Sequence, residues 1–251
     1  MSNASTHVAL VQKRVNDLLA WLSINETEDT TMDLMEAMKN RHSVRQYTDR
    51  PLDEEAVATL RKETDRINKE SGLHIQLITN ESDAFDAGAP SYGSFQGCRN
   101  YFAMIGPKGK DEEVGYYGEQ LVLLAQTLGI NSCWVAMTYK KGKSHGDITP
   151  GEKRYVVIAL GYGKTQGATH KVKSLTDISD YKAGDPDWYK AGLEAALLAP
   201  TAVNQQKFMI TRNGDKVSAK TAGFGFYTKM DLGIVKYHFE LGAGRGHDIW
   251  K

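Results

Sequence analysis

The sequence predicts an α+β fold in which a mixed sheet is flanked by helices. Two alternating hydrophobic patterns predict this class. Stretches with apolar residues three and four positions apart, typical of helices, lie between short runs rich in aromatic and β-branched residues, typical of strands. No apolar run approaches the ~20 residues needed to span a bilayer, so no membrane contact is expected.

The composition is that of an ordinary globular protein. The 251 residues suffice for one large domain or two small ones, and 41% are hydrophobic while 25% are charged. Thirty-one basic and thirty-one acidic residues cancel, so no bulk charge would attract nucleic acid. Cys98 and Cys133 lack a metal-ligand spacing, and no export signal is visible. A reduced, cytoplasmic protein without a metal site is expected.

The first elements follow from periodicity and capping residues. Residues 1–30 are predicted to form an amphipathic extension and a polar linker, with apolar residues at helical spacing from Val8 to Leu22. Residues 31–173 are predicted to form a first half that contains the sheet. Its helices are expected over 32–40, from about 53 to 68, and over 115–128; its strands over 73–78, 101–105, 133–137 and 155–160; and a mobile loop over 81–97.

Residues 174–251 are predicted to form a second, smaller half. A helix is expected over 188–198, a loop over 200–206, a strand over 207–211 and a helix over 230–241. This order echoes residues 54–128, which favours an internal duplication and hence a pseudo-dimer of two unequal halves. The alternative is that such units recur by chance in α+β proteins.

A first motif is Arg41-His42-Ser43-Val44-Arg45. Two guanidinium groups and a hydroxyl within five residues suit a phosphate dianion, because each can make a charge-assisted or neutral hydrogen bond to its oxygens. Taken alone, the pentapeptide would be read as a solvated basic turn.

A second motif is the small-residue loop Ala199-Pro200-Thr201-Ala202-Val203-Asn204-Gln205-Gln206. It offers free backbone amides and one asparagine amide that both donates and accepts. Proline and asparagine are common turn residues, so this loop is also a weak signal by itself.

Three further segments accompany these motifs: Leu128-Gly129-Ile130-Asn-Ser-Cys133-Trp134 after a helix, Leu160-Gly161-Tyr162 at a strand end, and Lys171-x-Lys173. Together the set resembles the signature of the nitroreductase family, the FMN-dependent oxidoreductases, over roughly residues 32–251. The resemblance implies a nitroreductase-like fold and a bound FMN reduced by NADH or NADPH.

The resemblance also implies the cofactor-binding residues. Arg41, His42, Ser43 and Arg45 would hold the phosphate with Lys171 or Lys173, and the loop would line the flavin ring and ribityl chain. The end of the Cys-Trp strand would face the flavin N5, although relatives often have Glu-Gly where this chain has Ala-Met. The implied set is Arg41, His42, Ser43, Arg45, Ala136, Met137, Lys171, Lys173, Pro200, Thr201, Ala202 and Asn204.

No catalytic acid, base or nucleophile is expected, because the cofactor would carry the chemistry. The scattered histidines and Cys133 are interpreted as structural or solvated. The expected activity is reduction of a small flat acceptor, such as a nitroaromatic, a quinone or an enone. Two alternatives stay open: a flavin-binding or storage protein without turnover, and an α+β binding module without flavin.

The separation of the two motifs is unusual. Nitroreductases are intertwined homodimers in which one subunit gives the Arg/Ser motif and the other the loop, and here one chain carries both, far apart. Lys69-Glu70-Ser71-Gly72-Leu73 stands where the first half would have its own loop. This pattern is typical of two fused subunits in which one of two sites has decayed, so a monomeric pseudo-dimer or a weak homo-oligomer is expected.

Overall fold

The computed structural model describes residues 33–85 and 94–251. The predicted helix over Val8–Leu22 and the centre of the predicted loop over 81–97 lie outside these residues. Four strands form one antiparallel sheet in the order β1-β2-β4-β3, and their bounds are β1 Gln76–Ile78, β2 Asn100–Pro107, β3 Asn131–Val135 and β4 Glu152–Gly161. Parallel pairing occurs in isolated bridges such as Ser43 with Ser132. The α+β class is therefore confirmed.

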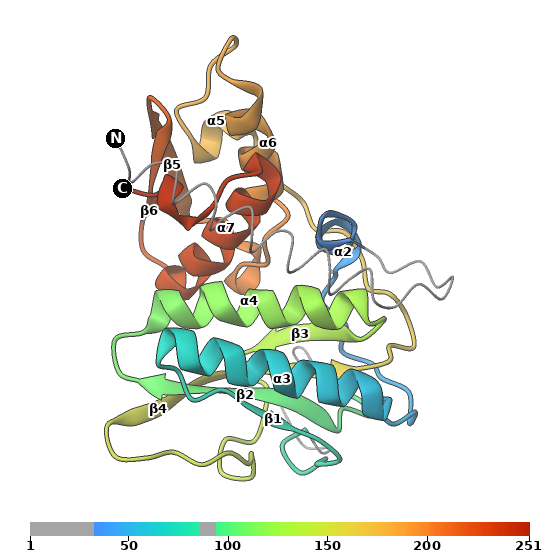
Figure 1. The fold of residues 1–251 in the computed structure, drawn as a ribbon. Coiled ribbons are helices and arrows are strands. Elements are labelled where there is room, and N and C mark those ends of the chain that lie inside the picture. Colours follow the sequence, from blue (N-terminus) through green and yellow to red (C-terminus); the bar gives the residue numbers. More distant parts are fainter. Residues whose placement is uncertain (1–32, 86–93) are drawn as a thin grey trace. The chain divides into compact units, whose positions relative to one another are not determined.

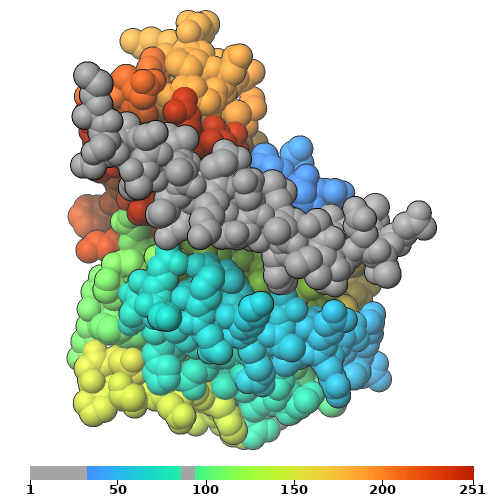
Figure 2. Space-filling view, viewed as in Figure 1, coloured from blue at the N-terminus to red at the C-terminus, as the bar shows by residue number. Residues whose placement is uncertain are grey.

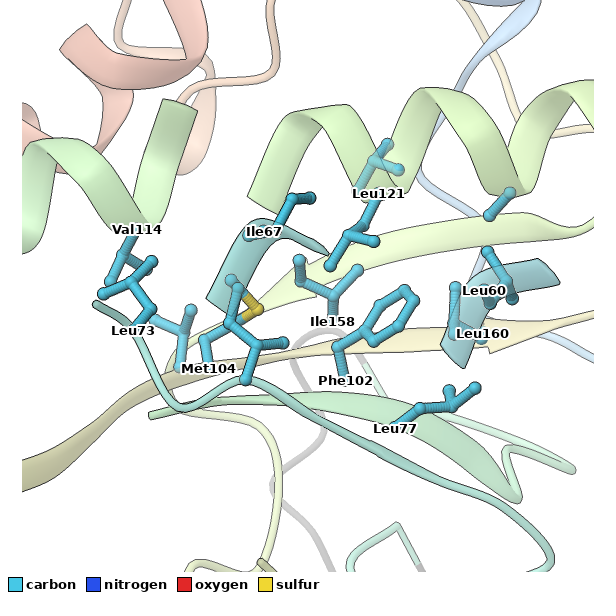
Figure 3. Close-up of a cluster of buried hydrophobic side chains, with 14 of the residues drawn as sticks. Leu60, Ile67, Leu73, Leu77, Phe102, Met104, Val114, Leu121, Ile158 and Leu160 are labelled. Atoms are coloured by element: carbon cyan, nitrogen blue, oxygen red, sulfur yellow. The ribbon is translucent and has the colours of Figure 1, made fainter. Parts of the chain in front are cut away.

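Helices α3 (Glu54–Ser71) and α4 (Asp111–Thr127) cover one face of this sheet (Figure 1). Figure 3 shows the cluster that joins them: Leu60 and Ile67 of α3 and Leu121 of α4 meet Phe102 and other strand residues. The opposite side of α3 is charged and lies at the surface in the space-filling view of Figure 2. The helix predicted from about 53 to 68 is therefore present and extends to Ser71.

Among the described residues, loops rather than helices cover the other face of the sheet. Tyr101 and Ala103, which alternate with Phe102, point to that face and pack against Tyr47, Phe85 and Phe95. Phe85 and Phe95 flank the segment that the structure does not describe, and both are buried. Phe85 contacts Tyr101 edge-to-face, with 5.8 Å between the ring centroids. The residues near both ends of the predicted mobile loop therefore pack into the core.

The second half repeats the helix–hairpin–helix order of the first. Its elements are α5 (Leu175–Ile178), α6 (Asp187–Ala196), β5 (Phe208–Asn213), β6 (Lys216–Thr221) and α7 (Thr228–Ala243), with short 3₁₀ turns η1 (Ala202–Asn204) and η2 (His247–Ile249). Strands β5 and β6 pair antiparallel in a separate sheet. A buried cluster that includes Tyr189 and Phe239 joins α6, α7 and this hairpin. Strand β6 was not expected from the sequence.

Helices α4 and α7 cross at two glycines. A Cβ on Gly115 would lie 2.0 Å from the carbonyl oxygen of Met230, and a Cβ on Gly233 would lie 1.9 Å from that of Glu112. Each glycine therefore contacts the other helix three residues before the glycine of that helix. The contact is the same in both directions, which gives the crossing a local two-fold relation. The absence of both side chains lets the two helix backbones touch.

The remaining helix, α2 (Leu34–Asn40), leads directly into the Arg41–Arg45 segment. Asp33 caps it by accepting a hydrogen bond of 2.7 Å from the Glu36 amide, and it ends where Arg41 turns to extended backbone. Within the described residues, no helix has both the length and the apolar character to cross a membrane.

Candidate cofactor site

The Arg41–Arg45 segment runs along strand β3. The Val44 amide donates to the Ser132 carbonyl at 3.0 Å, and on the other side the Arg45 carbonyl accepts from the Gln96 amide at 3.0 Å. This pairing fixes the backbone of the segment. It leaves Arg45 exposed and His42 and Ser43 half-buried, while Arg41 is 3% exposed.

Arg41 faces a fully buried carboxylate. Its Nε lies 3.7 Å from Oε1 of Glu119 on α4, and that oxygen also contacts Nε2 of His238 on α7 at 2.9 Å. The second oxygen of Glu119 accepts from the indole of Trp134 at 2.9 Å. Arg41, the most buried charged residue of the Arg41–Arg45 segment, thus belongs to a polar network that spans α4 and α7.

Two buried polar atoms beside this network have no hydrogen-bond partner among the described residues: Nε of Arg41 and Oγ of Ser132. Arg41 opens the Arg41–Arg45 segment, and Ser132 pairs with Ser43 through the backbone. Unpaired buried polar groups are rare in folded proteins because each costs free energy. The N–H of Arg41 Nε and the hydroxyl of Ser132 can each donate, which suits a ligand that supplies hydrogen-bond acceptors.

The segment from Gly167 to Lys173 joins the two predicted motifs. On one side, Gly167 packs so tightly against His42 that a Cβ there would lie 2.7 Å from the His42 Cβ. Burial lowers the pKa of His42, and the nearby charges of Arg41 and His170 lower it further. On the other side, Nε2 of His170 lies 3.0 Å from the Leu197 carbonyl. The segment therefore touches the Arg41–Arg45 segment and the approach to the 199–206 loop.

The loop is held against this connecting segment by its amide side chains. Both Asn204 Nδ2 and Gln206 Nε2 donate to the Lys171 carbonyl, at 2.9 and 2.8 Å. Lys173 donates from its backbone amide to Gln206 Oε1 at 2.9 Å and from Nζ to the Gln206 carbonyl at 2.8 Å. Both lysines are exposed, and the side chain of Lys173 bonds to the loop.

The contacts of Asn204 limit what its side chain can offer a ligand. Besides its bond to Lys171, its Oδ1 accepts from Gln206 Nε2 at 2.8 Å. One N–H and one lone pair remain for a cofactor, so the predicted contact to the flavin stays a prediction. Pro200, Thr201 and Ala202 are half-buried on the same loop.

Asp231 in the first turn of α7 supports the loop from its other side. Its Oδ1 accepts from the Ala202 amide at 3.0 Å and its Oδ2 from Gln205 Nε2 at 2.7 Å. Burial raises the pKa of Asp231 to about 6, although both hydrogen bonds act in the opposite direction. This carboxylate is therefore held ionised at neutral pH against the effect of its burial.

A dependence of stability on pH follows for Asp231. Because its pKa is higher in the folded state (about 6) than its ordinary value of 3.8, the folded state binds the proton more tightly. Stability is then greatest below pH 4 for this group and falls as pH rises from about 4 to 6, by about 3 kcal/mol in total. Urea unfolding of the wild type and Asp231→Asn at pH 4, 5, 6 and 7 checks this. The wild type should lose stability relative to the variant across that range, and parallel curves would contradict the assignment.

The third predicted contact region lies after strand β3. Ala136 is half-buried and packs on the main core, and Met137 is 70% exposed. Tyr139 in the same segment lies close enough to Tyr227 for that phenol to influence its pKa, which burial mainly raises. The Phe226 carbonyl, next to Tyr227, accepts from Gln205 Nε2 at 2.7 Å. The turn at residues 224–227 thus bonds to the loop, and Tyr227 packs on the same core cluster as Ala136.

The segment 167–173 links the Arg41–Arg45 segment to the 199–206 loop, and the turn at 224–227 bonds to that loop. The position of Ala136 and Met137 beside a flavin stays a prediction. Three further residues were missed by the sequence analysis: Glu119, Gln206 and Asp231. Gln206 is the last residue of the predicted loop, although it was not named among the cofactor-binding residues, and Asp231 lies in the first turn of the helix predicted over 230–241, so their positions were a usable signal. Nothing in the sequence pairs Glu119 with Arg41.

Cys133 lies in a buried strand, as expected, and His238 is a buried structural histidine. His238 is fully buried, Cys133 is 2% exposed, and burial raises the pKa of the Cys133 thiol. Lys236 of α7 pairs with Glu112 of α4 at 2.5 Å, so the side of α7 that carries Lys236 faces α4. In the described ranges, no group of three or more His, Cys, Asp or Glu side chains could hold a metal ion.

A scan against protein families finds one whose description is "Putative TM nitroreductase", and it matches residues 33–243. The chain belongs to this nitroreductase family. Membership places the protein among the oxidoreductases. It also confirms the resemblance drawn from the motifs.

Solved structures include similar folds. A Thermotoga maritima protein described as a putative nitroreductase is 24% identical, with a TM-score of 0.58, and the match covers 87% of each chain. A protein of the same description from Desulfovibrio desulfuricans, solved with FMN, is 16% identical, with a TM-score of 0.47 over 60% of this chain and 95% of its own. A third from Exiguobacterium sibiricum, also with FMN, is 16% identical, with a TM-score of 0.47 over 62% of this chain and 100% of its own. Among curated proteins, none matches the chain.

Proposed function

We propose that this nitroreductase-family protein is an FMN-dependent NAD(P)H oxidoreductase that reduces a small flat acceptor. One observation carries the proposal. The segment from Gly167 to Lys173 contacts His42 at one end and Asn204 and Gln206 at the other, so both parts of the flavin-binding signature converge within one chain.

The residues present fit the FMN phosphate and ribityl chain. Arg41 Nε makes no hydrogen bond, although Glu119 lies 3.7 Å away, and Ser132, whose Oγ also lacks a partner, pairs with Ser43 through the backbone. Arg45 and Lys171 present exposed cationic side chains on the two segments that meet there. A dianion would gain charge-assisted hydrogen bonds from such donors. The residues proposed to hold the cofactor are those named from the sequence, with Ala136 and Met137 beside the flavin N5.

FMN, when bound, would supply the two-electron chemistry between the nicotinamide and the acceptor. The chain's own part is to bind, orient and shield. Lys173 and Gln206 fix the loop to the connecting segment, and Asp231 fixes its other side. His42, whose pKa is lowered, stays neutral at pH 7 and can donate or accept one hydrogen bond.

The surface beside this site favours a flat, apolar acceptor. Met137, Val203, Phe224 and Phe226 are 70, 74, 99 and 77% exposed. Val203 lies on the loop, Phe224 and Phe226 lie on the turn that bonds to it through Gln205, and Met137 follows strand β3. Exposed apolar side chains favour an apolar ligand, and aromatic rings favour stacking with a planar one. Nitroaromatics, quinones and enones all have this shape.

We further infer that the chain is a fused pseudo-dimer, with one half over residues 31–173 and the other over 174–251. Three features support it: the repeated order of helix, paired strands and helix, the two-fold glycine crossing of α4 and α7, and one buried cluster formed mainly by each half. A monomer or a weak homo-oligomer in the cytoplasm is the state we expect.

Anaerobic reduction tests the proposed activity. The purified protein should be yellow with the absorbance spectrum of a flavin, and mixing with NADH or NADPH in a stopped-flow instrument should bleach that colour. Recovery of the colour on adding a quinone or nitroaromatic completes the cycle. A yellow protein that neither nucleotide bleaches would instead be a flavin-binding or storage protein, and a protein that binds no FMN would contradict both.

A further inference from the structure

The loop that follows Pro200 has a strained backbone. Val203, Asn204 and Gln206 have φ angles of 47°, 54° and 45°, in the left-handed region that favours glycine. Val203 is β-branched, which makes this conformation especially unfavourable. Such residues persist only where surrounding contacts hold them, and they concentrate at ligand sites.

Two sets of contacts hold the loop. On one side, the Gln206 side chain, which is 3% exposed, bonds to Lys171, Lys173 and Asn204. On the other side, Asp231 accepts from the Ala202 amide and from Gln205, whose Nε2 also donates to the Phe226 carbonyl. Asp231 is therefore the point where α7 fixes the start of the strained stretch.

The chain keeps this carboxylate at a cost to its own stability. Asp231 is 6% exposed, and burial raises its pKa to about 6. A neutral residue would avoid the desolvation of a charge at pH 7. An ionised oxygen, however, accepts stronger hydrogen bonds from an amide N–H than a neutral acceptor does.

We infer that Asp231 is a positioning residue that fixes the strained Ala202–Gln206 backbone in the conformation that receives the cofactor. This inference rests on the proposed function, in which the loop lines the flavin. Asp231 itself touches the loop and the turn after β6, so it acts on the cofactor through Ala202 and Gln205.

The test compares Asp231→Asn and Asp231→Ala with Asp185→Asn. Asp185 is a matched control, because it also accepts from a backbone amide, that of Lys182, and from a side chain, that of Arg212, just before helix α6. Three quantities are measured at pH 7: hydrogen–deuterium exchange of a peptide spanning residues 199–207 without added FMN, the FMN dissociation constant, and the midpoint of urea unfolding.

Both Asp231 variants should exchange the loop amides at least tenfold faster and bind FMN at least tenfold more weakly, with the larger effect in Asp231→Ala. Asp231→Asn should nevertheless unfold at a urea concentration no lower than that of the wild type, since it removes a buried charge. Asp185→Asn should leave loop exchange and FMN affinity unchanged.

Unchanged loop exchange in both Asp231 variants would overturn the inference. So would an affinity loss in Asp231→Asn that only follows a lower unfolding midpoint, because that result indicates a general structural role. Failure of the wild type to bind FMN would overturn the proposed function instead, and loop exchange would still decide whether Asp231 holds the backbone.

Discussion

Replacing Arg41 with alanine is expected to lower the free energy of unfolding by about 3–5 kcal/mol. The variant leaves Glu119, which is fully buried, without the cation 3.7 Å away. His238 does not replace that cation without cost. Its Nδ1 lies 3.2 Å from the Ala195 carbonyl and must donate a hydrogen bond there. Its Nε2, which contacts Glu119, can then donate to that carboxylate only if the imidazole carries a second proton. Urea unfolding at pH 7 measures the loss.

Arg45→Ala is the matched control, because this arginine is four positions away and exposed. Its stability should stay within about 0.5 kcal/mol of the wild type, while its FMN affinity should fall. Arg41→Ala should purify without colour at ordinary FMN concentrations. An Arg41→Ala protein as stable as the Arg45 variant would mean that Arg41 and Glu119 do not form a buried pair.

Replacing Gly233 with alanine is expected to destabilise the protein by about 3 kcal/mol, at the upper end for added volume in a packed core. The new Cβ would lie 1.9 Å from the Glu112 carbonyl oxygen and 2.7 Å from the Tyr116 nitrogen. Both are backbone atoms, so the clash can be relieved only if α4 and α7 separate. The midpoint of thermal unfolding and the free energy from urea unfolding both report the effect.

Gly142→Ala provides the control, since nothing lies within 4 Å of a Cβ at that position and its φ is not positive. It should change stability by less than about 0.5 kcal/mol. The double variant Gly115→Ala/Gly233→Ala should cost less than the sum of its parts, because one separation of the helices relieves both clashes. Fully additive costs would contradict a shared crossing point.

The sequence predicted the helices well where their apolar positions were periodic. Leu60 and Ile67, seven positions apart, both point into the core from α3, and Pro51 and Asp53 precede its start as expected. Strand β1 is shorter than predicted, because Asn68 takes the hydrogen-bonding groups of Ile75 that a longer strand would pair.

Strand β6 was missed because its pattern is weak. Val217 is its one fully buried residue, and lysines occupy other positions. The Asn213-Gly214 pair, with Gly214 at a φ of 65°, is a hairpin signal that would have predicted it.

The candidate site was predictable in its parts but not in its connections. Arg41 and Asn204 carry groups that suit a flavin, yet each is occupied by a residue distant in sequence, Glu119 and Lys171 respectively. Pairings of this kind depend on tertiary packing, which periodicity and spacing do not encode. The strain at Val203 is likewise a property of the folded loop.

We expect one cofactor site per chain, because the residues related to the loop and to the Arg41–Arg45 segment do not form a second one. At the position related to the 199–206 loop, Glu70 bonds to Arg66 at 2.5 Å, and Gly72 ends α3 directly. A phosphate dianion beside Glu70 would meet like charge without an available guanidinium. The related anion site in the second half has no Arg-x-Ser-x-Arg sequence.

The stoichiometry of FMN tests this central claim most directly. Protein saturated with FMN is freed of excess cofactor, its mass in solution is determined by light scattering, and the released FMN is quantified against chain concentration. We predict one FMN per chain, also in any monomeric fraction. Two FMN per chain would contradict the loss of the second site, and one FMN per two chains would contradict a site built within a single chain.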